Sequence, residues 1–220
     1  MIKACIFDLD GVVVYTDQYH YQAWKKLANH MGYDLTPFEN LMLKGLSRRD
    51  SLDTLLEMKG IRACENEKLM LSELKNKWYR RLLKDIDMSA VAKGAEDLIH
   101  DLRSAGMKTA LASSSKNAGI VVKKLRLEGL FDVIVDGNMV SASKPDPEIF
   151  VKCAGMLKVD PNKCIVFEDA QSGIDAAKSA GMHTVAICEE TSLKGADISV
   201  KTISNVSSNE IIKFNSNNQN

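Results

Sequence analysis

The chain alternates short, continuously apolar runs with segments of helical periodicity, and this alternation restricts the possible folds more than any other feature. The runs are rich in branched side chains and too short for helices, as is typical of parallel strands buried on both faces. They occupy residues 4–7, 109–112, 133–135, 164–167 and 184–187. The sequence therefore predicts an α/β fold with a doubly wound, Rossmann-like parallel sheet.

The segments between these runs carry helix signals. One segment has an apolar face from Ala95 to Leu102 and is expected to end at Gly106. Another is predicted to begin with Asp146 as N-cap and Pro147 as the first helical residue. Each predicted helix follows or precedes an apolar run, as the crossovers of a parallel sheet require.

Residues 15–88 interrupt the alternation of predicted strands and helices, because they carry helix signals and no strand candidate. One predicted helix has Trp24 on its apolar face, and Ser47 and Asp50 have the spacing of a helix cap. We expect a helical cap domain at 15–88, inserted into an α/β core made of 1–14 and 89–220. The polar residues 208–220 are expected to be frayed.

Charge and composition limit the function classes. Lys and Arg total 29, as do Asp and Glu, so the net charge is zero, which argues against a sequence-independent nucleic-acid binder. No apolar stretch approaches the roughly 20 residues of a membrane span, and the first residues lack the pattern of a signal peptide. The five cysteines are scattered without a C-x-x-C pair, so neither a disulfide framework nor a zinc site is predicted. We expect a cytoplasmic monomer that binds neither nucleic acid nor membrane.

Polar residues follow four of the predicted strands, at the edge of the sheet where ligands of parallel α/β proteins bind. Asp8 and Asp10 follow the first strand, Ser113 the second, Lys144 the third and Asp169 the fourth. A hard cation such as Mg²⁺, which prefers oxygen ligands, would offset the repulsion between closely spaced carboxylates. Hydroxyls, loop amides and a lysine suit a phosphate. The sequence therefore predicts a site for Mg²⁺ and a phosphorylated substrate.

Four segments in this order resemble the haloacid dehalogenase superfamily of phosphotransferases: "FDLDGV", "LASSSKN", "SKPDPEIF" and "FEDAQSGIDAAKSAG". Within it, "DQYHYQAWKKLA" and "LKGLSRRDSL" are similar to the cap of the β-phosphoglucomutase family. The similarity runs from about Ile2 to Ile187. It implies conversion of β-glucose 1-phosphate to glucose 6-phosphate through a bisphosphate intermediate.

The resemblance also implies residue roles. Asp8 would be the nucleophile and Asp10 the general acid and base, with Thr16 and His20 governing where Asp10 points. Ser113 and Lys144 would bind the transferring phosphate. The implied Mg²⁺ ligands are the side chains of Asp8, Glu168 and Asp169 and the backbone carbonyl of Asp10.

The remaining implied positions face the substrate. Those that bind the sugar are Trp24, Lys44, Gly45, Leu46, Ser51 and Lys75, and those that bind the phosphates are Arg48, the Ser114 amide, Ser115, Lys116 and Asn117. Two positions depart from the family pattern: Tyr15 stands where a hinge acid is common, and Ser114 replaces a more usual alanine. We expect little effect from Ser114, because its backbone amide makes the contact.

Other interpretations compete with this one. D-x-D-G also begins calcium-binding loops, but Gly11 comes too early for that motif. Trp24 could simply pack the cap, and Arg48 and Lys75 could be solvated helix residues. A phosphatase that uses the same aspartates is the nearest functional alternative, and a non-catalytic sugar-phosphate sensor is another.

Overall fold

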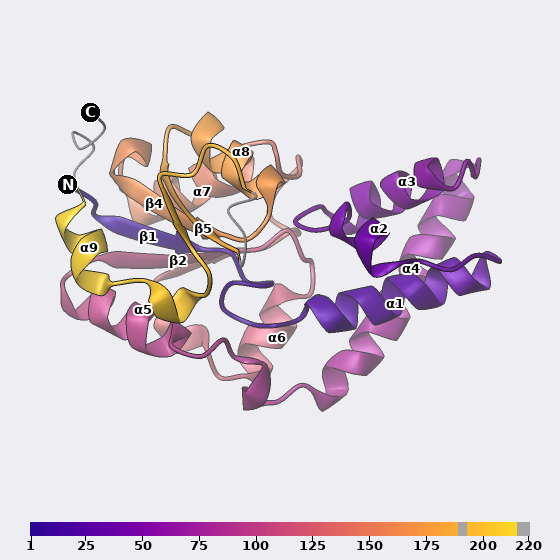
Figure 1. The fold of residues 1–220 in the computed structure, drawn as a ribbon, viewed down its shortest axis with the longest axis horizontal. Helices are drawn as coiled ribbons and strands as arrows, with labels where there is room; N and C mark the ends of the chain where they lie inside the picture. The colour runs from indigo at the N-terminus through magenta and orange to yellow at the C-terminus, as the bar shows by residue number, and fades with distance from the viewer. Residues whose placement is uncertain (189–192, 215–220) are drawn as a thin grey trace.

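The computed structural model describes residues 1–188 and 193–214, in which a parallel sheet forms the central layer. All of its strand pairs are parallel, in the order β3-β2-β1-β4-β5-β6. The bounds are β1 Ala4–Phe7, β2 Lys108–Ala112, β3 Val133–Val135, β4 Cys164–Glu168, β5 His183–Ile187 and β6 Ile198–Val200. The predicted doubly wound sheet is confirmed (Figure 1).

Helices cover both faces of the sheet, so alternate residues of the central strand β1 enter different apolar clusters. Cys5 and Phe7 pack in the cluster that includes the inner faces of α5, α6 and α9. Ala4 and Ile6 pack in the cluster formed with α7 and α8 on the opposite face (Figure 1). The bounds of these helices are α5 Ala95–Ser104, α6 Ala118–Lys124, α7 Glu148–Leu157, α8 Gln171–Ser179 and α9 Ser208–Lys213. Because β1 is buried on both faces, its sequence is a continuous apolar run.

The segment that follows β1 forms four helices to one side of the sheet (Figure 1). They are α1 Asp17–His30, α2 Pro37–Leu41, α3 Arg48–Met58 and α4 Glu65–Leu82. These helices have an apolar cluster of their own, which includes Trp24 and Leu52. Ser47 caps α3 as expected, because its side chain accepts a hydrogen bond from the Asp50 amide.

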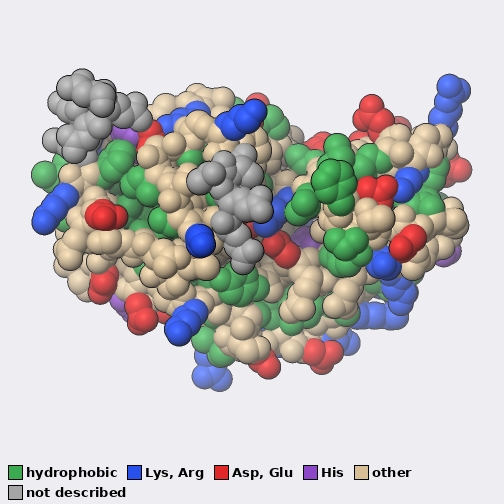
Figure 2. Space-filling view, viewed as in Figure 1, with side chains coloured by type: hydrophobic (Ala, Val, Ile, Leu, Met, Phe, Trp, Pro, Cys, Tyr) green, Lys and Arg blue, Asp and Glu red, His purple; other side chains and the backbone are tan. Residues whose placement is uncertain are grey.

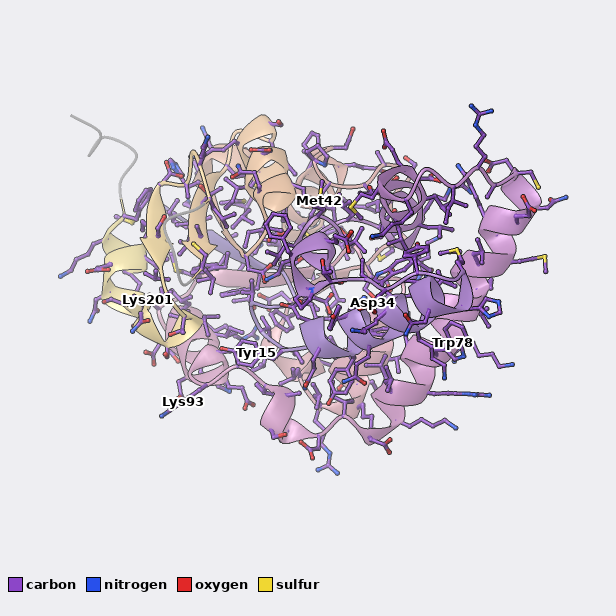
Figure 3. The ribbon with its side chains drawn as sticks, turned by 45° about the vertical axis from the view of Figure 1, so that its right-hand side comes forward. Tyr15, Asp34, Met42, Trp78, Lys93 and Lys201 are labelled. Atoms are coloured by element: carbon purple, nitrogen blue, oxygen red, sulfur yellow. The ribbon has the colours of Figure 1, made fainter. Side chains whose placement is uncertain are left out.

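The chain leaves and re-enters the sheet layer at one place. Val14 and Val91 form an antiparallel bridge, and the Tyr15 amide donates to the Ala90 carbonyl at 2.7 Å. Figure 3 shows Tyr15 at this junction, and the residue is 44% exposed. Short 3₁₀ helices complete the fold at η1 Leu83–Asp85, η2 Met88–Ala90, η3 Glu128–Leu130, η4 Pro161–Lys163 and η5 Ile203–Asn205.

Two expectations for the fold need correction. Residues 208–213 are not frayed but form α9, because Ile211 is buried in the core and Ser207 caps the helix. The remainder of that segment, 215–220, lies outside the described residues. Helix α7 begins at Glu148, so Pro147 is its N-cap residue, although Asp146 still accepts the Glu148 amide at 2.9 Å. Among the described residues, no helix is long and apolar enough to cross a membrane.

Candidate active site

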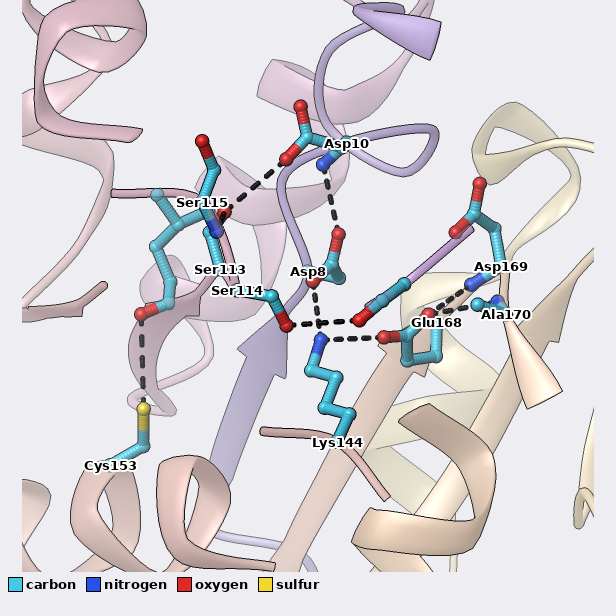
Figure 4. Close-up of polar contacts among 12 residues, drawn as sticks. Asp8, Asp10, Ser113, Ser114, Ser115, Lys144, Cys153, Glu168, Asp169 and Ala170 are labelled. Carbon is cyan, nitrogen blue, oxygen red and sulfur yellow. Dashed lines mark hydrogen bonds and ion pairs between the residues drawn. The ribbon is translucent and has the colours of Figure 1, made fainter. Parts of the chain in front are cut away.

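The carboxyl ends of β1 and β4 bring acidic side chains to Lys144. Its ammonium lies 2.5 Å from Asp8 Oδ1, just after β1, and 2.6 Å from Glu168 Oε1, the last residue of β4 (Figure 4). Lys144 is 2% exposed, so both ion pairs are removed from water. The Asp10 amide donates to Asp8 Oδ2 at 2.9 Å and fixes the second carboxylate oxygen.

Three buried carboxylates lie close enough to share one cation. Asp8, Glu168 and Asp169 each offer an oxygen within 4.8 Å of the others. Gly11 has a positive φ of 87°, and a Cβ atom there would lie 1.7 Å from Asp169 Oδ2. Only glycine therefore allows the turn after Asp10 to pass this closely behind Asp169.

Burial dominates the pKa values of these acids. Burial raises the pKa of Asp8 to about 8; Lys144 opposes this effect, while Glu168 and Asp10 add to it. The pKa of Asp169 is also raised, again mainly by burial and against the attraction of Lys44. Without further positive charge, the site therefore resists holding all its carboxylates ionised.

Asp10 is held by residues from the loop before α1 and from the end of β2. Thr16 Oγ1 donates a short hydrogen bond to Asp10 Oδ1, and Ser113 Oγ donates to Oδ2 at 3.3 Å. His20 Nε2 lies 3.6 Å from Oδ1. Burial alone would raise the pKa of Asp10, but the contacts with His20, Thr16 and Ser113 lower it below its ordinary value. Asp10 is therefore a carboxylate at neutral pH.

His20 continues this network into the helical segment. Lys75 Nζ lies 3.0 Å from His20 Nδ1, in hydrogen-bonding range. The His20 ring also packs on Tyr79, with ring centroids 4.1 Å apart. Burial and the nearby Lys75 charge lower the pKa of His20, and Asp10 only partly offsets them. His20 is thus a neutral link between Lys75 on α4 and Asp10.

A cavity of about 350 Å³ lies between the sheet edge and the helical segment. Most of the predicted substrate and catalytic residues line it: Asp8, Asp10, His20, Trp24, Lys44, Gly45, Leu46, Arg48, Ser51, Lys75, Ser114, Ser115, Lys116 and Asn117. The other predicted residues do not line the cavity but contact one another or the side chains of Asp8 and Asp10. They are Thr16, Ser113, Lys144, Glu168 and Asp169.

Two residues predicted to bind the substrate, Lys44 and Arg48, form ion pairs with acidic side chains of the protein. Lys44 lines the cavity, but its ammonium binds Asp169 at 2.6 Å and Asp17 at 3.1 Å. Its pKa is raised, since these carboxylates outweigh burial. Arg48 pairs with Glu73 at 2.8 Å. Both cations therefore already have partners within the protein.

Ser114 has a contact that sequence reasoning missed. Its hydroxyl donates to the Gly45 carbonyl at 3.0 Å and joins the loop after β2 to the segment before α3. Alanine at this position could not make that bond.

Sequence reasoning also missed several residues that line the cavity: Asp17, Gln18, Tyr21, Pro37, Asn40, Leu41 and Leu43. Tyr21 lies three positions before Trp24 on α1, so helical spacing could have identified it. The residues of α2 gave no such signal, because none of them is buried.

The fold and this site define an α/β enzyme that binds its ligand at the carboxyl ends of parallel strands. A model described as "Haloacid dehalogenase-like hydrolase" matches residues 5–187, and the chain belongs to this family.

Individual relatives include mutases and phosphatases. A β-phosphoglucomutase of Bacillus subtilis (strain 168) is 38% identical over 207 residues, 93% of this chain and 92% of that protein. A phosphorylated carbohydrates phosphatase of Thermotoga maritima is 34% identical over 187 residues, 84% of each chain. The crystal structure of a β-phosphoglucomutase from Clostridium difficile has a TM-score of 0.91 and 41% identity, and the match covers 96% of both chains.

Proposed function

We propose that this protein is a β-phosphoglucomutase, which interconverts β-glucose 1-phosphate and glucose 6-phosphate through β-glucose 1,6-bisphosphate. One observation carries the proposal: the same cavity is lined by Asp8 and Asp10 and by the cations Arg48 and Lys116. A mutase must hold both phosphates of a bisphosphate, whereas a phosphatase needs to hold only one. The similarity to β-phosphoglucomutases supports this assignment.

The proposed chemistry uses two aspartates. In the first step, the free sugar hydroxyl attacks the phosphorus of phospho-Asp8; the bond between phosphorus and the Asp8 carboxylate breaks, and Asp10 takes the hydroxyl proton. The bisphosphate then turns round. Asp8 attacks the other phosphorus, and Asp10 returns its proton to the departing sugar oxygen. The lowered pKa of Asp10 suits the first step, because a base must begin ionised.

The donor set fits a divalent cation. Asp8, Glu168 and Asp169 offer only carboxylate oxygens, the ligands that Mg²⁺ prefers. We propose that these side chains, with the Asp10 carbonyl, hold Mg²⁺. When bound, this ion would neutralise the charge that gathers between the carboxylates and the phosphoryl oxygens.

A sugar-phosphate phosphatase is the second candidate. A separate hollow of about 370 Å³ is lined by Ser114 and Lys144 and also by Arg48. Asp8 does not line this hollow but contacts Lys144, which does, so the hollow would bring water near phospho-Asp8, and attack by water would release inorganic phosphate. Closure of the helical segment over the sheet edge would favour the mutase, because it excludes water.

One experiment separates these functions. The protein is incubated with β-glucose 1-phosphate, Mg²⁺ and a phosphorylating primer, and the products are followed by phosphorus NMR. A mutase yields glucose 6-phosphate, and a phosphatase yields inorganic phosphate in proportion to the sugar consumed. If the sugar phosphate is not consumed, both catalytic proposals are wrong, and the third interpretation, a sugar-phosphate sensor, gains support.

A further inference from the structure

A third hollow, of about 460 Å³, lies between helices α4 and α6, outside the cavity described above. Four cations from α4 and η1 line it: Lys77, Arg80, Arg81 and Lys84. Figure 2 shows Lys and Arg side chains gathered along the lower right edge of the molecule, where Figure 1 places α4. This local excess of positive charge contrasts with the zero net charge of the chain.

The four cations have no ion-pair partner among the residues that the structure describes. Lys77 lies three and four positions before Arg80 and Arg81, and Lys84 lies four and three positions after them, spacings at which like charges on a helix repel one another. The dipole of α4 favours cations in its last turn, which accounts for Arg80 and Arg81 but not for Lys77. Glu73 is the one acid lining the hollow, and Arg48 already holds its carboxylate at 2.8 Å.

Two contacts hold the walls of this hollow together. At one end, Lys124 of α6 donates to the Leu83 carbonyl at 3.1 Å and also to the Lys84 carbonyl. At the other end, Asn117 Nδ2 donates to Asn76 Oδ1 at 3.0 Å. The positions of α4 and α6 are therefore fixed relative to each other, and a ligand would have to order only the side chains between them.

We propose that this hollow is a second anion site, which binds a small polyphosphate with at least two linked phosphate groups. Lys77 and Lys84 are seven residues apart, about 10 Å along a helix, which is longer than a single phosphate group. The volume lies within the range of small-molecule sites, roughly 300–1,000 Å³. Lysine and arginine side chains are the usual partners of phosphate oxygens. The proposal does not depend on the reaction at Asp8.

The test is isothermal titration of the full chain with tripolyphosphate in Mg²⁺-free buffer. Lys77→Gln/Arg81→Gln should weaken one binding site at least about 100-fold, because it removes two charge-assisted hydrogen bonds to phosphate. The matched control is Lys93→Gln/Lys201→Gln, which removes two exposed lysines that Figure 3 shows away from α4. Arg48→Gln identifies any binding in the other cavity.

The site is supported if the control pair and Arg48→Gln retain the binding that Lys77→Gln/Arg81→Gln loses. Equal affinity in the wild type and in Lys77→Gln/Arg81→Gln overturns the proposal. An equal loss in the control pair also overturns it, since binding would then follow net charge alone. A single-stranded oligonucleotide that binds more tightly than tripolyphosphate, with an affinity that rises with its length, would indicate a nucleic-acid surface instead.

Discussion

Lys75 allows the electrostatics of the candidate site to be tested without an activity assay, because its ammonium is almost wholly removed from water. The residue is 2% exposed. Its Nζ lies 3.0 Å from His20 Nδ1 and over the rings of Trp24 and Tyr79, 4.5 and 4.8 Å from their centroids. No carboxylate forms an ion pair with it among the described residues. Replacing Lys75 by methionine should therefore remove a buried charge while filling a similar volume.

The expected size of the effect follows from the pKa of Lys75. Burial and the charge of Arg48 lower it from 10.5 to about 7, and the charge of Asp10 only partly opposes them. Between pH 7 and 9 the folded protein thus increasingly holds the amine neutral, while the unfolded chain keeps it protonated. The unfolded state binds more protons, so the free energy of unfolding rises with pH, by about 2 kcal/mol over this window.

The assay is urea unfolding of the wild type and Lys75→Met at several pH values between 7 and 9. The stability advantage of Lys75→Met should be largest at pH 7 and smaller by about 2 kcal/mol at pH 9. Contributions from groups such as Cys5, whose thiol pKa burial raises, occur in both proteins and cancel. Lys26→Met is the matched control, since Lys26 is exposed and lies over the Trp78 ring. A Lys75→Met difference that is as independent of pH as that of the control would refute the reasoning.

Three further substitutions test the site itself. Asp8→Asn should lower turnover at least about 10³-fold, because it removes the proposed nucleophile; mutase activity retained in this variant would end that assignment. Arg48→Ala should slow glucose 6-phosphate formation about 10- to 100-fold, because charge-assisted hydrogen bonds to phosphate are lost. Its Mg²⁺ affinity should stay unchanged, and a matching loss of Mg²⁺ affinity would contradict the assignment of Arg48 to phosphate binding. Gly45→Ala should raise KM, because the new Cβ would lie 2.6 Å from Ser172 Oγ and 2.7 Å from Ala170 Cβ. Its φ of 75° should also lower stability by about 1–2 kcal/mol, and an unchanged KM would show that the segment before α3 adjusts freely.

The sequence predicted the buried elements of the fold well and the exposed ones poorly. Strand β6, Ile198–Val200, was missed because its middle residue, Ser199, is polar and exposed, so it lacks the continuous apolar run of the equally short edge strand β3. Helix α2, Pro37–Leu41, was missed because none of its residues is buried. A local signal was nevertheless present, since Thr36 and Glu39 form a capping box.

In the candidate site, contacts that the sheet topology determines could be predicted, and contacts with the helical segment could not. The meeting of Asp8, Lys144 and Glu168 could be predicted, because parallel topology brings strand ends to one edge. The partner of Lys44 could not, because its contact with Asp169 depends on how the helical segment sits over the sheet. The pairing of Arg48 with the exposed residue Glu73 has no sequence signal either.

Under the proposed function, these internal pairs determine the order in which a phosphate recruits the cations of the site. Glu73 is 72% exposed on its side chain, and an exposed ion pair contributes about 1 kcal/mol or less, so a phosphate can displace it from Arg48 at little cost. The Asp169 side chain is 5% exposed, and removing Lys44 would leave its charge buried, which costs about 3–5 kcal/mol. Lys44 can therefore turn toward a substrate when another positive charge takes its place at Asp169 or when Asp169 takes up a proton. Arg48 lies on α3 and Lys44 in the loop before it, so under the proposed function we expect substrate binding to be linked to movement of the helical segment.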